Sequence, residues 1–168
     1  LYAHDAKSMS SPGLSRLALT LSLACLLYVG FLLANNMTLM LNLQAWTGYL
    51  HSPGGTLLNL SHATLWSRYW HMMLAAPAVA GLYAALLGVK KRRQDWVDHG
   101  LAWFTRLTRA QVLVGGWVLM SLPREVMLGF MGGSGPATAV LALGVLLGLA
   151  ALLAGIQKKT APAAWLTF

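Results

Sequence analysis

The sequence predicts an all-α integral membrane protein, a bundle of four membrane-spanning helices with both termini in the cytoplasm. Of the 168 residues, 57% are hydrophobic and only 10% are charged, whereas ordinary soluble domains carry about 25% charged residues. Four apolar segments approach the roughly 20 residues that a helix needs to cross the hydrocarbon core. The loops that join these segments differ strongly in their content of Lys and Arg, which indicates an orientation.

The four predicted spans lie near residues 14–42, 66–89, 104–123 and 137–156 and form a single transmembrane domain over residues 1–168. The polar stretch of residues 1–13 is expected to be a loop. The third span is the least apolar, because Arg106, Thr108, Arg109 and Gln111 lie at its start. Long basic side chains at a helix end can extend to the headgroups, so the span is retained. The outer segment of residues 43–65 is predicted as a long loop, of the kind that often covers a site.

Basic residues lie mainly on one side of this arrangement, which predicts that this side is cytoplasmic. Ten of the twelve are there: Lys7, Arg16, Lys90, Lys91, Arg92, Arg93, Arg106, Arg109, Lys158 and Lys159. Only Arg68 and Arg124 fall on the outer side. We therefore expect a multi-pass protein of a bacterial inner (cytoplasmic) membrane. The net charge of +8 then reflects topology and attraction to anionic lipids, and no nucleic-acid partner is expected.

The motifs of soluble enzymes are missing from the sequence. Cys25 is the only cysteine, so the chain alone provides no disulfide, iron–sulfur cluster or covalent haem attachment. It also has no Walker loop, dinucleotide fingerprint or HExxH motif. Function must therefore be sought in the membrane segments.

His71 is the most informative residue, because an imidazole within an apolar span normally faces a partner, a cavity or a cofactor. Ala75 and Ala78 follow it at i+4 and i+7, and this spacing predicts a flat recess beside the ring. Arg68, at i−3, lies on the same face and could pair with a haem propionate. We interpret His71 as an axial ligand of a b-type haem. The alternative is that the Ala-rich face packs on another helix and His71 bonds a neighbouring side chain.

A second axial ligand is left open by the sequence, because both His and Met serve this role. The candidates near the same membrane level are Met37, Met40, Met120, Met127, His51 and His62, or a residue of another subunit.

Other polar residues lie at the outer membrane level. Glu125, the only glutamate, is a candidate proton acceptor for a bound quinol, or it forms a surface ion pair with Arg124. Asn35 and Asn36 are expected either to bind a ligand or to form hydrogen bonds across helices.

Residues 63–85, ATLWSRYWHMMLAAPAVAGLYAA, resemble the haem-bearing helix of cytochrome bd quinol oxidase subunit I. In that family the helix enters from the outer side and carries a histidine that ligates the low-spin b haem, and His71 matches it. Residues 1–40, from Leu1-Tyr-Ala-His to Asn35-Asn-Met-Thr-Leu-Met40, are similar to the preceding loop and helix of shorter bd-like subunits, which are often associated with multihaem c-type cytochromes. The N-terminal half of the oxidase subunit and its long quinol-binding loop have no counterpart in this chain. The resemblance therefore implies electron transfer, not oxygen reduction by this chain.

Together these observations predict a membrane-anchoring b-haem subunit of a respiratory redox complex. It would transfer electrons between membrane quinone or quinol and a multihaem c-type cytochrome or other outer-face oxidoreductase. Its expected partners are other membrane subunits and lipid. The alternative is a cofactor-free structural subunit that scaffolds a larger complex. A small transporter is disfavoured, because four helices with one buried ionisable residue make a poor transport path.

Overall fold

The computed structural model describes residues 12–52, 54 and 57–158, and every regular element within them is helical. The expected loop of residues 1–13 lies almost wholly outside the described residues, as do Lys7 and Lys159. The chain divides into two compact units, Leu1–Asn59 and Leu60–Phe168. We describe each unit by itself.

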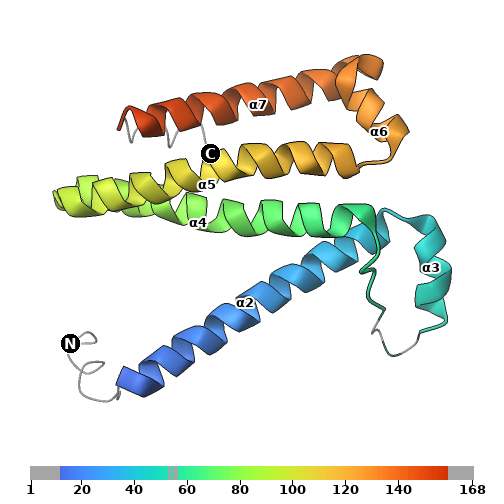
Figure 1. Cartoon of the computed structure of the whole chain (residues 1–168), viewed down its shortest axis with the longest axis horizontal. Coiled ribbons are helices and arrows are strands. Elements are labelled where there is room, and N and C mark those ends of the chain that lie inside the picture. Colours follow the sequence, from blue (N-terminus) through green and yellow to red (C-terminus); the bar gives the residue numbers. More distant parts are fainter. Residues whose placement is uncertain (1–11, 53, 55–56, 159–168) are drawn as a thin grey trace. The chain divides into compact units, whose positions relative to one another are not determined.

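The first unit contains α2 (Pro12–Met40) and α3 (Leu43–Leu50) (Figure 1). α2 confirms the first predicted helix, and most of its large apolar side chains are exposed, as expected for a helix in contact with lipid. α3 differs from the prediction, because it lies inside the segment expected to be a loop. Asn42 accounts for its start: the side-chain Oδ1 accepts a hydrogen bond from the Gln44 N–H at 3.2 Å, in the manner of an N-cap.

The second unit contains α4 (Ala63–Lys91), α5 (Gln94–Ser121) and α7 (Gly135–Ile156), with the short α6 (Arg124–Leu128) and π-helical η1 (Gly129–Gly133) before α7. α4 and α7 confirm the predicted helices near 66–89 and 137–156. In Figure 1, α5 lies between α4 and α7.

α5 begins at Gln94, well before the predicted start near residue 104. Only Arg92 and Arg93 link it to α4, where a loop of about a dozen residues was expected. The reason is a buried stripe with helical spacing: Val97, Leu101 and Phe104 lie at i, i+4 and i+7 and pack into the core of this unit. The polar residues around them concealed this stripe in the sequence.

Three helices are long and apolar enough to cross a membrane: Gly13–Met40, Ala63–Lys91 and Gly135–Ile156. α5, which carries Asp95, Asp98, Arg106 and Arg109, is not among them. The structure therefore shows an all-helical chain with three candidate spans among the described residues.

Small residues let α4 and α5 approach until their backbones touch. A Cβ placed on Gly81 would lie 2.8 Å from the Gly100 carbonyl oxygen, and one on Gly88 would lie 2.8 Å from the Val97 nitrogen. Close contact of this kind gives helices in lipid their packing energy. Helix α7 packs closely on α5 as well, because a Cβ on Gly155 would lie 2.8 Å from the Phe104 ring.

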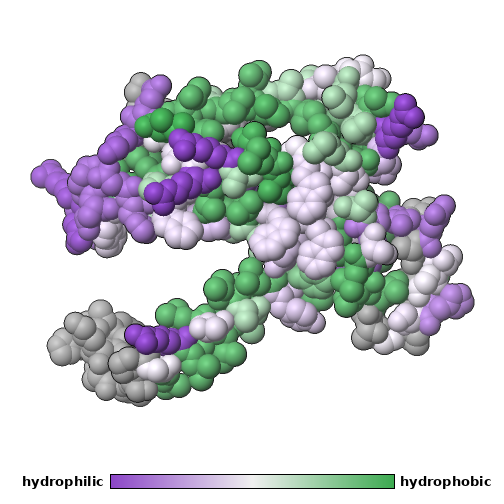
Figure 2. All heavy atoms as spheres, in the orientation of Figure 1, coloured by the Kyte–Doolittle hydropathy of each residue, from purple (hydrophilic) through white to green (hydrophobic). Residues whose placement is uncertain are grey.

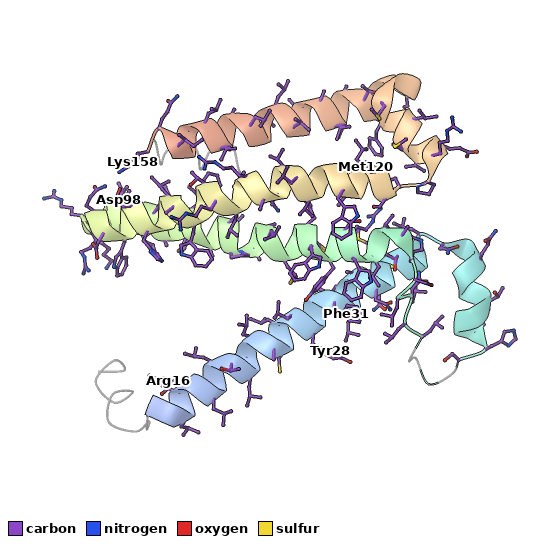
Figure 3. The ribbon with its side chains drawn as sticks, viewed as in Figure 1. Arg16, Tyr28, Phe31, Asp98, Met120 and Lys158 are labelled. Atoms are coloured by element: carbon purple, nitrogen blue, oxygen red, sulfur yellow. The ribbon has the colours of Figure 1, made fainter. Side chains whose placement is uncertain are left out.

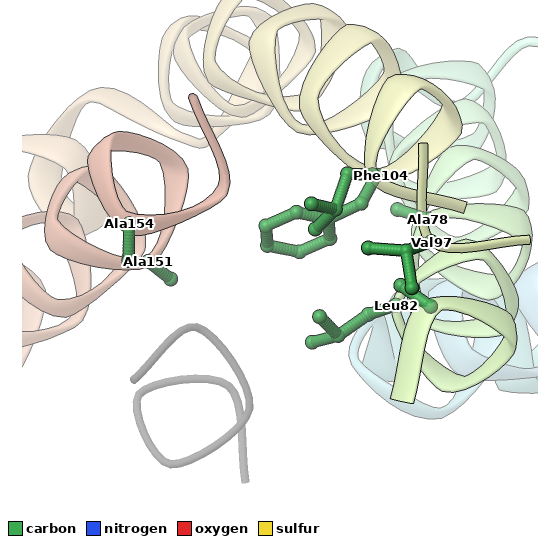
Figure 4. Close-up of a cluster of buried hydrophobic side chains, with 8 residues drawn as sticks. Ala78, Leu82, Val97, Phe104, Ala151 and Ala154 are labelled. Carbon is green, nitrogen blue, oxygen red and sulfur yellow. The ribbon is translucent and has the colours of Figure 1, made fainter. Parts of the chain in front are cut away.

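Phe104 fills the space between the three helices of the second unit (Figure 4). It is 2% exposed and is surrounded by small and aliphatic side chains of all three helices. The surrounding cluster is Ala78, Leu82, Ala85, Val97, Leu101, Ala151 and Ala154. This cluster fixes the register of the hairpin and so determines which residues of α5 face His71.

The turn from α6 to α7 depends on a left-handed glycine. Gly132 has φ of 114°, a conformation that L side chains rarely adopt. The Thr138 hydroxyl accepts a hydrogen bond from the Gly132 N–H at 3.0 Å and donates one to the Gly129 carbonyl at 3.3 Å. The side chain of Thr138, in the first turn of α7, thus satisfies two backbone groups of this turn.

Candidate functional site

His71 lies on α4 with its ring against α5. A Cβ placed on Gly115 would lie 3.5 Å from Cε1 and 3.8 Å from Nδ1 of the ring, so this glycine faces the imidazole directly. The Nδ1 atom is buried and has no hydrogen-bond partner among the described residues. A buried nitrogen without a partner is costly, so it requires an explanation. The contact with Gly115 could not be read from the sequence.

The backbone at His71 is also held by α5. Gln111 donates a hydrogen bond from Nε2 to the His71 carbonyl oxygen at 2.9 Å. Nearer the N-terminal end of α4, the hydroxyls of Ser67 and Ser121 lie 2.8 Å apart. Hydrogen bonds between α4 and α5 therefore form at His71 and one turn before it. The sequence did not reveal them, because Gln111 and Ser121 are far from α4 along the chain.

The small face that was predicted beside His71 divides in two. Ala78 is 3% exposed and belongs to the hydrophobic core with α5 residues, so its part of the face is occupied. Ala75, closer to the ring, is half-buried, and so is Arg68 at i−3. At Ala78 the face packs on another helix, as the alternative interpretation expected. Only Ala75 and Arg68 lie where residues next to a ligand of His71 were expected.

Met120 and Met127 lie in the same unit as His71. Met120 lies on α5 (Figure 3). Its side chain is 72% exposed. It comes five residues after Gly115, which places it roughly 140° around the helix from the residue that faces the imidazole. Met120 therefore does not approach the His71 ring from across the α4–α5 interface. Met127 is half-buried in α6.

The imidazole of His62 caps the start of α4. Its Nδ1 accepts a hydrogen bond from the Thr64 N–H at 3.3 Å and lies 3.0 Å from the Thr64 hydroxyl. Because Nδ1 accepts, the proton of a neutral ring lies on Nε2, which then cannot bind a metal without losing it. The cap therefore competes with a ligand role for His62. Histidine is not a favoured N-cap residue, so the sequence gave little signal of this.

Three candidate ligands, Met37, Met40 and His51, belong to the first unit. Met37 and Met40 are on α2 and are 47% and 70% exposed. His51 is exposed, and its N–H bonds the Thr47 carbonyl at 3.3 Å just after α3. These three residues stay candidates for a second ligand.

Asn35 has a structural role that neither expectation described. It is 2% exposed, and its side chain bonds the segment that follows α3. Oδ1 accepts from the Asn59 N–H at 2.7 Å, and Nδ2 donates to the Leu57 carbonyl at 3.3 Å. Asn35 thus ties an extended segment to α2 within the first unit, in place of a ligand or a second helix. Asn36, beside it, is exposed.

Glu125 lies exposed in the short helix α6. Neither it nor Arg124 takes part in a salt bridge within the described residues, where the ion pairs are Arg93–Asp95 and Lys158–Asp98. The expected pairing of Glu125 with Arg124 is thus not formed.

Comparisons of the chain with models of protein families, with curated proteins and with solved structures find no match.

Proposed function

We propose that this chain is a membrane-embedded subunit of a redox complex, in which His71 binds a b-type haem near the outer face. The observation that carries the proposal is the half-buried imidazole of His71 within the apolar, membrane-length helix α4, with its ring held against Gly115 of α5. The resemblance of residues 63–85 to the haem-bearing helix of cytochrome bd subunit I supports the same role. A bound haem supplies one-electron transfer between a quinol and an outer-face cytochrome or oxidoreductase.

The residues of this chain would position that group. Tight packing of α4 on α5 leaves no room for a porphyrin on the Nδ1 side, so His71 would bind iron through Nε2. Arg68 offers a guanidinium on the same face of α4 for a propionate. The small side chain of Ala75 would leave space for the group beside the His71 ring. We propose the opposite ligand among Met37, Met40, Met120, Met127 and His51, or from another subunit.

Four crossings with cytoplasmic termini fit this proposal. α5 runs antiparallel to α4 along nearly its whole length, from the Ser67–Ser121 contact at one end to the Gly88–Val97 contact at the other. If α4 crosses the bilayer, α5 crosses beside it. Its charged residues lie toward the cytoplasmic end, where basic side chains reach the headgroups. The inner membrane of a bacterium is the location we propose.

Glu125 is the proposed proton acceptor for a quinol at the outer level. Its exposed carboxylate lies two residues after Pro123 in the outer turn of the second unit, and no salt bridge occupies it within the described residues.

The second candidate function is a cofactor-free scaffold. The observation that favours it is the occupied face of α4, where Ala78, Gly81 and Gly88 contact α5 at distances that leave no space for a ligand. In this case the close-packed hairpin would provide a rigid surface for larger subunits, and His71 would serve packing alone.

A reduced-minus-oxidised spectrum of the full chain, purified from membranes, separates the two functions. We expect a b-type absorbance in the wild type, its loss in His71→Ala, and its retention in His99→Ala, since His99 is exposed at the cytoplasmic end. A second variant, Gly115→Leu, keeps the imidazole but adds bulk where the ring now lies, so the absorbance should shift or weaken. Unchanged absorbance in His71→Ala would overturn the assignment, and no absorbance in the wild type would favour the scaffold.

A further inference from the structure

An open groove of about 280 Å³ lies between α5 and the end of α7. Its lining comes from one face of α5 and the last turn of α7. These residues are Asp98, Leu101, Ala102, Thr105, Arg109, Gly155, Ile156 and Lys158. The groove thus combines an apolar wall with two cations and one carboxylate, and its formal charge favours an anion.

The depth of the groove follows from the length of α7. This helix has 22 residues, which corresponds to about 33 Å and matches a hydrocarbon core of roughly 30 Å. Ile156 therefore lies near the inner boundary of the core, and Thr105, which contacts Gly155, lies at the same level. Arg109 comes one turn further along α5, about 6 Å toward the hydrocarbon.

Arg109 needs an anion at this depth. It makes no hydrogen bond or ion pair with the described residues of the chain, and a guanidinium inside the boundary must extend to the headgroups to stay charged. The Thr105 hydroxyl donates its hydrogen to the Leu101 and Ala102 carbonyls, so the side-chain donors of the groove are Arg109 and Lys158.

Lys158 lies at the mouth of the groove and forms an ion pair with Asp98, which also lines it. Its Nζ lies 2.8 Å from Asp98 Oδ1, and Figure 3 places the two side chains together at the end of α5 and α7. In Figure 2, hydrophilic side chains gather at this end of the second unit while α7 presents hydrophobic residues along its length. A headgroup at the mouth would have its acyl chains beside that surface.

We propose that this groove binds the phosphate of an anionic phospholipid, with Arg109 on the hydrocarbon side and Lys158 on the aqueous side. Basic pockets between helices on the cytoplasmic side take anionic headgroups. The apolar wall and the depth of Arg109 favour a lipid over free phosphate. The inference rests on the proposed crossing of α5 and α7, but it is independent of the haem at His71.

The test measures the relative association of spin-labelled phosphatidylglycerol and phosphatidylcholine with the full chain in phosphatidylcholine vesicles. We expect a preference for phosphatidylglycerol that Arg109→Gln lowers about fivefold, as loss of one basic contact predicts. Arg106→Gln is the matched control, because Arg106 is, like Arg109, an exposed arginine of α5 but does not line the groove. It should leave the preference nearly unchanged.

Two further arms make the result decisive. Lys158→Gln, at the helix end and outside the core, should also lower the preference, and Asp98→Asn should raise it by releasing Lys158. Equal losses in Arg109→Gln and Arg106→Gln would show general surface attraction and overturn the site. Displacement of the lipid by inorganic phosphate at constant ionic strength would overturn the choice of a lipid as ligand. The haem spectrum of each variant should equal that of the wild type, so failure of this inference is distinct from failure of the haem assignment.

Discussion

A Cβ on Gly100 would clash with the carbonyl oxygen of Gly81, so α4 and α5 touch through their backbones at this crossing. The same Cβ would also lie 2.6 Å from the Ala85 nitrogen. Backbone atoms cannot rotate away as a flexible side chain can. The hairpin therefore depends on the absence of a side chain at residue 100.

Gly100→Ala should lower the free energy of unfolding by about 1–3 kcal/mol, the usual cost of overpacking a close contact. The measurement is helix content during denaturation of the purified chain in mixed micelles. Gly116→Ala is the control, because a Cβ there would meet nothing within 4 Å and alanine favours a helix by about 0.5–1 kcal/mol. Equal stability of the two variants would contradict the close contact.

This crossing also shows what the sequence could predict. The apolar runs of α2, α4 and α7 were long enough to identify each helix. The predicted start of α5 was wrong, because polar residues interrupt the stripe of Val97, Leu101 and Phe104. Only the packing of this stripe in the core shows that it is the buried face of a helix. Tertiary packing, which composition does not reveal, decided that boundary.

The candidate site was predictable in part for a similar reason. His71 could be identified from its cost in an apolar span. Its neighbours Gly115 and Gln111 could not, because their register depends on the glycine contacts of the hairpin far from the site. His62 was expected only as a ligand candidate, and its cap on Thr64 is visible only once the start of α4 is known.

Asn35→Ala should destabilise the first unit, because it removes the partners of the Asn59 N–H and the Leu57 carbonyl. Leaving buried polar groups unsatisfied costs about 1–3 kcal/mol. Hydrogen exchange at the Asn59 amide should become correspondingly faster. Asn36→Ala, at the exposed neighbouring position, should change the exchange rate little. Slow exchange in both variants would show that Asn35 does not hold this segment.

Asp98 and Lys158 form an ion pair at the start of α5, with Nζ 2.8 Å from Oδ1. The hydrogen bond from Lys158 lowers the pKa of the Asp98 carboxyl, and the positive charge of Lys158 acts in the same direction, while partial desolvation opposes both. A carboxyl whose pKa is lower in the folded than in the unfolded chain stabilises the fold above its unfolded pKa. That contribution is lost as the pH falls through the lowered value.

Carbon NMR of the aspartate carboxyls should therefore show Asp98 titrating below its usual range, and Lys158→Gln should raise its pKa toward that range. Asp95 provides an internal control, because the hydrogen bond from Arg93 lowers the pKa of its carboxyl and Lys158 takes no part. Its titration should be the same in both proteins. If the pKa of Asp98 is unchanged in Lys158→Gln, the pair does not form in solution, and Lys158 is free to bind an anion without competition from Asp98.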